Sequence, residues 1–236
     1  MEKITYRLEN EVAVVSLNSG ENRFNNDFLD AFLSVMDDIE NNTGARTLIV
    51  TSSHEKIFSN GIDLDWLSQF ISAGQIDEVR KFLYKQNEMF KRMVTSPLIT
   101  IAAISGHAFA GGAILACAFD FRLMRSDRGF FCFPEVDLGI PFLPGMLELL
   151  KSAIPLYKMD EMQYTGCRLT AQECEAHHII TKACHQDDLM KEALALATRF
   201  NKERKTVGEM KRRMNRHIVQ AMDVDDVKYI EAGRLF

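Results

Sequence analysis

The chain has 236 residues, 47% of them hydrophobic and 26% charged, with a formal net charge of −5. This composition predicts a folded globular protein with a sizeable core, and the negative balance argues against general attraction to nucleic acid or to an anionic membrane. The opening segment, MEKITYRLENEV, lacks the apolar core of a signal peptide, and no run reaches the length of a membrane span. The five cysteines form no Cys-x-x-Cys pair, which favours reduced thiols in a cytoplasmic protein and predicts no metal site.

The first half of the chain alternates strand-like and helix-like segments. Residues 12–17 and 47–51 are apolar and rich in β-branched side chains, so they are expected to form strands. Between them, residues 26–41 place apolar side chains at helical spacing behind a capping Asn25 or Asn26, which predicts an amphipathic helix packed on a sheet. This order indicates an α/β fold.

A second helix is expected over residues 76–94, ended by Ser96 before Pro97. Residues 98–104 form an almost continuous apolar run, which is typical of a strand covered on both faces. A glycine turn follows at residues 105–112 and leads into a helix of small residues. Turns of this kind, between a strand and a helix, tend to carry functional sites.

Beyond Pro141 the sequence is mostly helical. The expected helices cover residues 144–152, 155–165, 171–177, 187–201 and 206–222. We divide the chain into a core over residues 1–175 and a helical region over residues 176–236. In the last helix, Met210, Met214, Ile218 and Met222 are expected to share one face, while the basic stretch from Lys211 to Arg216 is typical of a solvated face.

Two short segments carry the candidate chemistry, residues 58–64 and residues 107–112. Glycines in both allow close backbone approach, and the second segment opens a helix whose first N–H groups lack intrahelical acceptors. Together the segments are suited to present two backbone N–H groups to a thioester enolate, as an oxyanion hole does. In the alternative interpretation, Gly111 and Gly112 only let a helix and a strand pack closely.

These segments, followed by Asp120 and by the stretch Phe-Pro-Glu-Val-Asp-Leu-Gly at residues 133–139, resemble the enoyl-CoA hydratase/isomerase (crotonase) superfamily in order and spacing. The resemblance implies a spiral of ββα units with a helical C-terminal trimerisation region. It also implies that the backbone amides of Ile62 and Gly111 are the oxyanion donors and that Glu135 is the catalytic base.

Hydratases of this superfamily use two glutamates, and the resemblance places the first at Ile114 and the second at Glu135. An isoleucine neither accepts nor donates a proton, so hydration is disfavoured. Moving a double bond from the 3,4 to the 2,3 position needs one base, which Glu135 supplies. Dienoyl-CoA isomerases add an aspartate at the position of Leu143, which argues against that reaction.

An apolar wall around Glu135 is expected to raise the pKa of its carboxyl toward neutrality. The expected lining is Phe131, Phe133, Ile140, Phe142 and Leu143. The alternative for Glu135 is a capping or surface carboxylate. His107 is interpreted as a packed side chain, and the pair His177 and His178 lacks a partner at metal-ligand spacing.

The resemblance implies no cofactor apart from coenzyme A as part of the substrate. Arg23 and Phe24 occupy the first loop that contacts the coenzyme in the superfamily, although a solvated Arg23 is the alternative. The further residues expected along the coenzyme and the thioester are Ser59, Gly61, Ile62, Asp63, Leu64 and Gly111. Asp63 is also expected to cap the helix that follows it, and it is not interpreted as catalytic.

The resemblance therefore implies a 3,2-enoyl-CoA isomerase of the fatty-acid β-oxidation type, which binds an acyl-CoA thioester and assembles as a homotrimer or a dimer of trimers. A hydratase with an atypical water site, a thioester hydrolase or a decarboxylase would keep the same enolate chemistry. A non-catalytic acyl-CoA-binding subunit is the alternative from another functional class. Trp66, Phe70 and Phe90 are expected in the core or along the acyl pocket.

Overall fold

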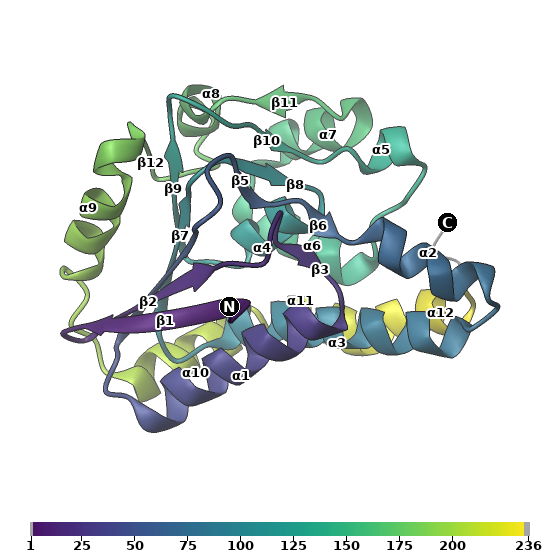
Figure 1. Ribbon diagram of the computed structural model, residues 1–236, viewed down its shortest axis with the longest axis horizontal. Helices are drawn as coiled ribbons and strands as arrows, with labels where there is room; N and C mark the ends of the chain where they lie inside the picture. The colour runs from purple at the N-terminus through teal and green to yellow at the C-terminus, as the bar shows by residue number, and fades with distance from the viewer. Residues whose placement is uncertain (1, 234–236) are drawn as a thin grey trace.

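A six-stranded main sheet is the centre of the fold in a computed structural model, which describes residues 2–233 (Figure 1). Its strands in spatial order are β1 (Ile4–Glu9), β2 (Val12–Leu17), β4 (Thr47–Ser52), β7 (Ile99–Ile104), β9 (Phe121–Arg125) and β12 (Lys182–Cys184). β1 and β2 form an antiparallel hairpin, and the other neighbours pair in parallel. The apolar runs predicted as strands are confirmed, because the parallel strands are covered on both faces.

Shorter strands form a second layer above this sheet (Figure 1). One small sheet contains β11 (Arg168–Leu169), β10 (Phe131–Cys132), β8 (His107–Phe109) and β5 (Ile57–Ser59), and another pairs β3 (Arg23–Phe24) with β6 (Gly61–Ile62). Three long strands, β4, β7 and β9, are each followed by a short strand of this layer and then by a helix. This repeating order confirms the predicted spiral of ββα units.

Helices cover both faces of the main sheet. On one face, α1 (Asn26–Asn42) and α3 (Ile76–Thr95) pack through apolar stripes. The other face is covered by α9 (Gln186–Ala197), whose Leu189 and Ala193 contact the sheet. The start predicted for the first helix is confirmed, because the side chain of Asn25 accepts a hydrogen bond from the Phe28 amide at 3.0 Å.

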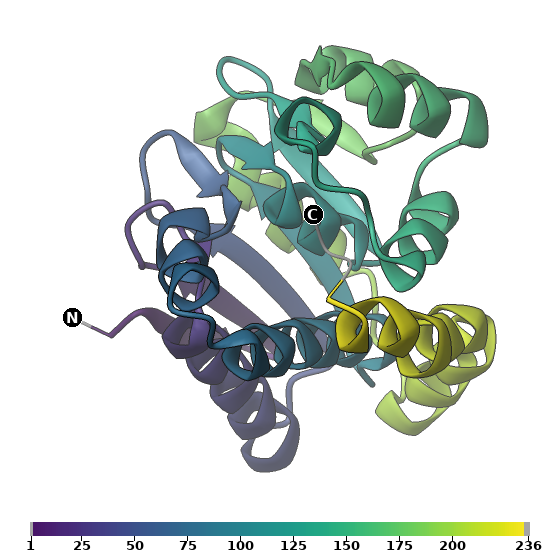
Figure 2. The same ribbon diagram turned by 90° about the vertical axis from the view of Figure 1, so that its right-hand side faces the viewer.

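The remaining helices surround the second layer and the C-terminal side of the molecule. They are α2 (Leu64–Ser72), α4 (Gly111–Cys117), α5 (Glu135–Leu138), α6 (Pro144–Ala153), α7 (Leu156–Thr165), α8 (Ala171–Ala176), α10 (Arg204–Met214), α11 (Arg216–Gln220) and α12 (Asp226–Glu231). Figure 2 shows the C-terminal helices lying across α3 and next to α6. None of the described helices combines the length and the apolarity that a membrane crossing needs.

The prediction of one continuous helix over residues 206–222 is wrong, because the structure divides this stretch into α10, α11 and a π-helical turn. The chain is interrupted at Asn215, whose side-chain amide donates to the Val94 carbonyl of α3 at 2.6 Å, and a π-helical turn at Ala221–Asp225 follows α11. Because of this break, Met214 is exposed while Met222 is buried, and the expected continuous apolar face is absent from the described helices.

The division placed between residues 175 and 176 stays a prediction. Beyond it, β12 pairs with β9 and extends the main sheet, and α9 covers one face of that sheet. The sheet therefore uses chain from both sides of the division.

Candidate active site

A cavity of about 270 Å³ opens between the second layer and the surrounding helices. Most of its wall is apolar, including Leu64, Leu67, Leu83, Ile114, Phe142 and Met146. Its polar side chains among the described residues are Arg23, Asn60, Gln86 and Glu135. An apolar cavity with a few polar groups on its wall is the usual form of a small-molecule site.

Gly61 and Gly111 bring two backbone segments into direct contact at one side of this cavity. A Cβ atom placed on Gly61 would lie 2.4 Å from the Gly111 nitrogen, and Gly61 has a φ of +70°. A Cβ atom on Gly112 would lie 2.2 Å from the Ser59 carbonyl oxygen. Only glycines permit this approach, so the close packing of the two turns is observed, and it is compatible with both interpretations of these glycines.

Ile62 and Gly111, the two residues predicted to supply backbone N–H groups, both line the cavity next to this contact. Gly111 is the first residue of α4, where an N–H group has no intrahelical acceptor, while the amides of Ala113 and Ile114 both donate to the Ala110 carbonyl. Directly after β6, the amide of Asp63 donates to the Phe24 carbonyl at 2.9 Å. The alternation of donors along a strand favours an Ile62 N–H that points away from β3.

Ala110 has a strained backbone immediately before Gly111. Its φ is +50° and its ψ is −128°, which a residue with a Cβ atom rarely adopts. The Ala110 amide donates to the Cys132 carbonyl at 3.0 Å, which holds this turn against β10. Strain of this kind is found preferentially at functional sites.

Glu135 is the first residue of α5 and lies on the cavity wall. Its side chain is buried, and Oε2 has no hydrogen-bond partner among the described residues. Burial raises the pKa of the Glu135 carboxyl from its ordinary 4.5 to about 7. Such a group is half ionised near neutral pH, as a general base requires.

The apolar wall expected around Glu135 is found in part. Ile140, Phe142 and Leu143 line the cavity, whereas Phe131 and Phe133 are fully buried behind it. Phe133 packs edge-on against Phe142, with ring centroids 5.8 Å apart. The two inner phenylalanines therefore support the wall without forming its surface.

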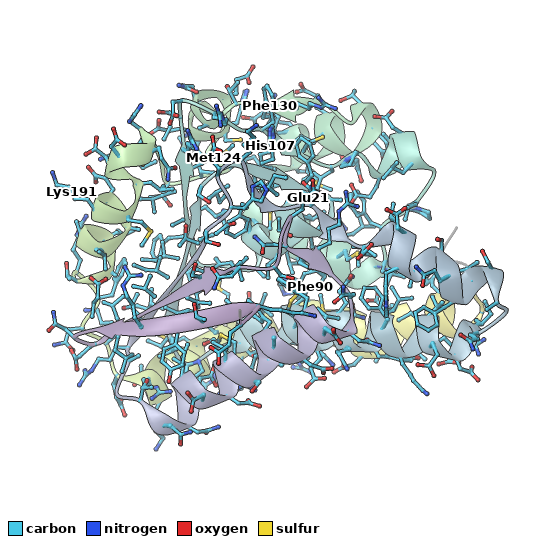
Figure 3. All side chains as sticks on the ribbon, in the orientation of Figure 1. Glu21, Phe90, His107, Met124, Phe130 and Lys191 are labelled. Carbon is cyan, nitrogen blue, oxygen red and sulfur yellow. The ribbon has the colours of Figure 1, made fainter. Side chains whose placement is uncertain are left out.

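Arg23 lines the cavity with a partly exposed side chain and is already engaged by a carboxylate. Its Nε lies 2.8 Å from Oε2 of Glu21, and that oxygen also accepts from the Asn60 side chain at 3.1 Å. Hydrogen bonding by Arg23 and Asn60 lowers the pKa of Glu21 below its ordinary value. Figure 3 shows Glu21 next to the short strands of the second layer. Phe24 is fully buried and packs under Gly111.

The other residues predicted along the coenzyme divide into two groups. Ile62, Leu64 and Gly111 line the cavity. Ser59 is buried, donates to the Asn22 carbonyl at 2.7 Å and accepts from the Gly61 amide at 3.1 Å, so it fixes the turn. The side chain of Asp63 accepts from the Trp66 amide at 3.1 Å, which confirms the predicted cap of α2.

His107 is packed between aromatic rings, as predicted (Figure 3). Its Nδ1 accepts from the Phe130 amide at 3.3 Å, and burial lowers the pKa of its imidazole. Trp66 packs on Phe70 and Phe82 and does not line the cavity. Within residues 2–233, no group of three potential metal ligands is found.

Lys211 is buried, contrary to the solvated basic face predicted for its helix. Its Nζ lies 2.5 Å from Oδ2 of Asp120 and donates to the Leu98 carbonyl at 2.6 Å. Asp120 also accepts from the Thr100 amide at 2.7 Å. This lysine therefore anchors α10 to the end of the main sheet.

The sequence analysis missed several lining residues, among them Gln86 and Met146. Gln86 lies three residues after Leu83 on α3, within a stripe of buried apolar side chains. A polar residue at a core position of an amphipathic helix is a signal that could have identified Gln86 as a lining residue. Met146 had no such signal, because its helix reaches the cavity only through the tertiary fold.

Comparisons with known proteins show the family to which this chain belongs. The family model described as enoyl-CoA hydratase/isomerase matches residues 7–232. Enoyl-CoA delta isomerase 3 of Arabidopsis thaliana is 31% identical over 171 residues, covering 70% of this chain and 69% of that protein. The short-chain-enoyl-CoA hydratase of Clostridium acetobutylicum is 29% identical over 194 residues, covering 81% of this chain and 72% of that protein.

Solved structures share the fold over nearly the whole chain. A probable enoyl-CoA hydratase from Mycobacterium tuberculosis superposes with a TM-score of 0.87 at 20% identity, covering 98% of this chain and 96% of that one. An enoyl-CoA hydratase/isomerase family protein from Pseudomonas syringae gives a TM-score of 0.88 at 22% identity, with 97% of each chain covered. The family model matches almost the whole of this chain, residues 7–232. This chain therefore belongs to the enoyl-CoA hydratase/isomerase (crotonase) family.

Proposed function

We propose that this protein is an enoyl-CoA isomerase that shifts the double bond of a 3-enoyl-CoA to the 2,3 position. One observation carries the proposal: Glu135 is the single carboxylate among the described residues that line the cavity. Ile114, at the position where hydratases of the family carry their first glutamate, lines the same cavity and is buried. The site therefore offers one proton acceptor inside an apolar wall.

The reaction follows from this arrangement. The thioester oxygen accepts hydrogen bonds from the N–H groups of Ile62 and Gly111. Glu135 takes a proton from C2, and the electrons of that C–H bond move into a dienolate whose negative oxygen the two N–H groups stabilise. The protonated Glu135 then returns the proton to C4, which forms the C2–C3 double bond and restores the carbonyl. No atom is gained or lost.

Hydration is less compatible with this wall. Adding water to a 2-enoyl-CoA requires groups that position and activate the water, and Ile114 can do neither. The unpartnered Oε2 of Glu135 is suited instead to carry one proton between two carbons of the same substrate. Because the relatives include both isomerases and hydratases, an analysis of the reaction product is needed to distinguish the two activities.

The coenzyme is proposed to enter past Arg23. This guanidinium lines the cavity and is partly exposed. To pair with a coenzyme phosphate, it must either leave Glu21 or bind Glu21 and the phosphate together. We also propose a homotrimer or a dimer of trimers. The exposed apolar side chains Met210 and Met214 on α10 and Tyr157 and Tyr164 on α7 support self-association, which light scattering after gel filtration measures.

Replacing Glu135 by Gln tests the catalytic role. The variant keeps the shape of the side chain but cannot accept a proton, so we expect turnover of a 3-enoyl-CoA to fall by about 10²- to 10⁴-fold while the affinity for a saturated acyl-CoA is kept. Glu88→Gln, at an exposed position on α3, is the matched control and should turn over like the parent. Parent-like turnover by Glu135→Gln would refute the mechanism.

A further inference from the structure

Gln86 presents an unsatisfied amide in the wall of the active-site cavity. It lies on α3, and no part of its side chain is exposed to bulk solvent. Both Oε1 and Nε2 lack a hydrogen-bond partner among residues 2–233. A buried amide without partners destabilises the fold, so its presence on a cavity wall indicates that a ligand completes it.

No side chain or backbone group of residues 2–233 hydrogen-bonds to the Gln86 amide. Leu83, one turn earlier on α3, lines the same cavity, as do Leu67 and Met146 from other helices. The next residue, Asn87, faces a different direction and donates to Asp226 of α12 at 2.8 Å. Asn87 therefore fastens the C-terminal helix, while Gln86 has no such structural role.

We propose that Gln86 binds a hydroxyl group on the acyl chain, beyond the double bond, and that the substrates are hydroxylated acyl-CoA thioesters. This inference rests on the proposed function, because it places the acyl chain in the cavity. Gln86 has a free donor and a free acceptor, and a hydroxyl both donates and accepts. A keto group would satisfy Nε2 alone, and an unsubstituted chain would satisfy neither atom.

A binding measurement separates this inference from the isomerase proposal. We would titrate the protein calorimetrically with saturated acyl-CoAs of one chain length, unsubstituted, hydroxylated at each successive carbon beyond C4, or carrying a keto group there. Saturated chains cannot be isomerised, so the dissociation constants do not depend on turnover. At least one hydroxylated chain should bind tenfold or more tightly than both the unsubstituted chain and its keto counterpart.

Two variants test whether Gln86 is the cause. Gln86→Met is nearly isosteric but has no hydrogen-bonding amide, so the preference for the hydroxylated chain should fall to less than threefold. Met89→Leu, buried on the same helix but not lining the cavity, should keep the preference. If Gln86→Met does not fold, Gln86→Leu takes its place. The titration of the parent alone still shows whether a hydroxylated chain binds more tightly than the other chains.

Three outcomes would overturn the inference. The parent could bind all chains equally, which is also the result if water satisfies Gln86. The keto chain could bind as tightly as the hydroxylated chain, or the preference for the hydroxylated chain could survive in Gln86→Met. Failure of the parent to bind any acyl-CoA would instead refute the proposed function. Tight binding without isomerisation of a 3-enoyl-CoA would refute the isomerase reaction and leave the role of Gln86 supported.

Discussion

Glu135→Gln should change the pH dependence of stability as well as catalysis. Burial raises the pKa of Glu135 from 4.5 in its ordinary state to about 7 in the folded chain. Between these two values the folded chain keeps the proton and the unfolded chain releases it, so the unfolding free energy of the parent falls as pH rises. At about 1.4 kcal/mol for each pKa unit, the loss amounts to roughly 3 kcal/mol.

The glutamine variant lacks this loss, because its amide does not ionise. Relative to the parent, Glu135→Gln should gain roughly 3 kcal/mol of unfolding free energy between pH 4.5 and pH 8, with the change centred between pH 4.5 and 7. Urea unfolding followed by the fluorescence of the single tryptophan, Trp66, measures this at several pH values. The exposed Glu88→Gln is the control. A constant difference between variant and parent across pH would show that Glu135 is not a buried, perturbed carboxyl.

Three further predictions follow from the same contacts. The kcat/KM for a 3-enoyl-CoA should fall about tenfold for each pH unit below about 7 and be level above it, because Glu135 acts as the carboxylate; a flat profile would contradict this. Gly61→Ala should lower turnover by at least about 100-fold, since its Cβ would lie 2.4 Å from the Gly111 nitrogen, whereas Gly44→Ala, with open space around it, should not. Lys211→Met should lower the unfolding free energy by about 2 kcal/mol by leaving Asp120 without its cation, and the exposed Lys205→Met should change it little in the same denaturation assay.

The sequence was informative where local patterns decide structure. The strand at residues 47–51 and the helix at residues 26–41 were predicted from their apolar spacing, and both lie within one residue of the observed bounds. The two glycine turns were predicted to meet, and Gly61 and Gly111 are in backbone contact. Burial of Glu135 was expected from its apolar neighbours in sequence and is confirmed.

The rest depends on contacts between distant segments. Nothing local to the helix at residues 204–214 indicates that Lys211 turns inward to Asp120, more than 90 residues earlier in the chain. The break at Asn215 follows from its hydrogen bond to Val94 of another helix. The position of Gln86 on the buried stripe of its helix was readable from the sequence, but the lack of a partner for its amide depends on the cavity that Leu67, Met146 and other segments form around it.

Product analysis tests the central claim most directly. The purified protein would be incubated separately with a 3-enoyl-CoA and a 2-enoyl-CoA, and the products followed by chromatography and mass. A single-base site predicts conversion of the 3-enoyl-CoA to the conjugated 2-enoyl-CoA with unchanged mass, and no addition of water to the 2-enoyl-CoA. A product heavier by one water, or no conversion of the 3-enoyl-CoA, would contradict the account.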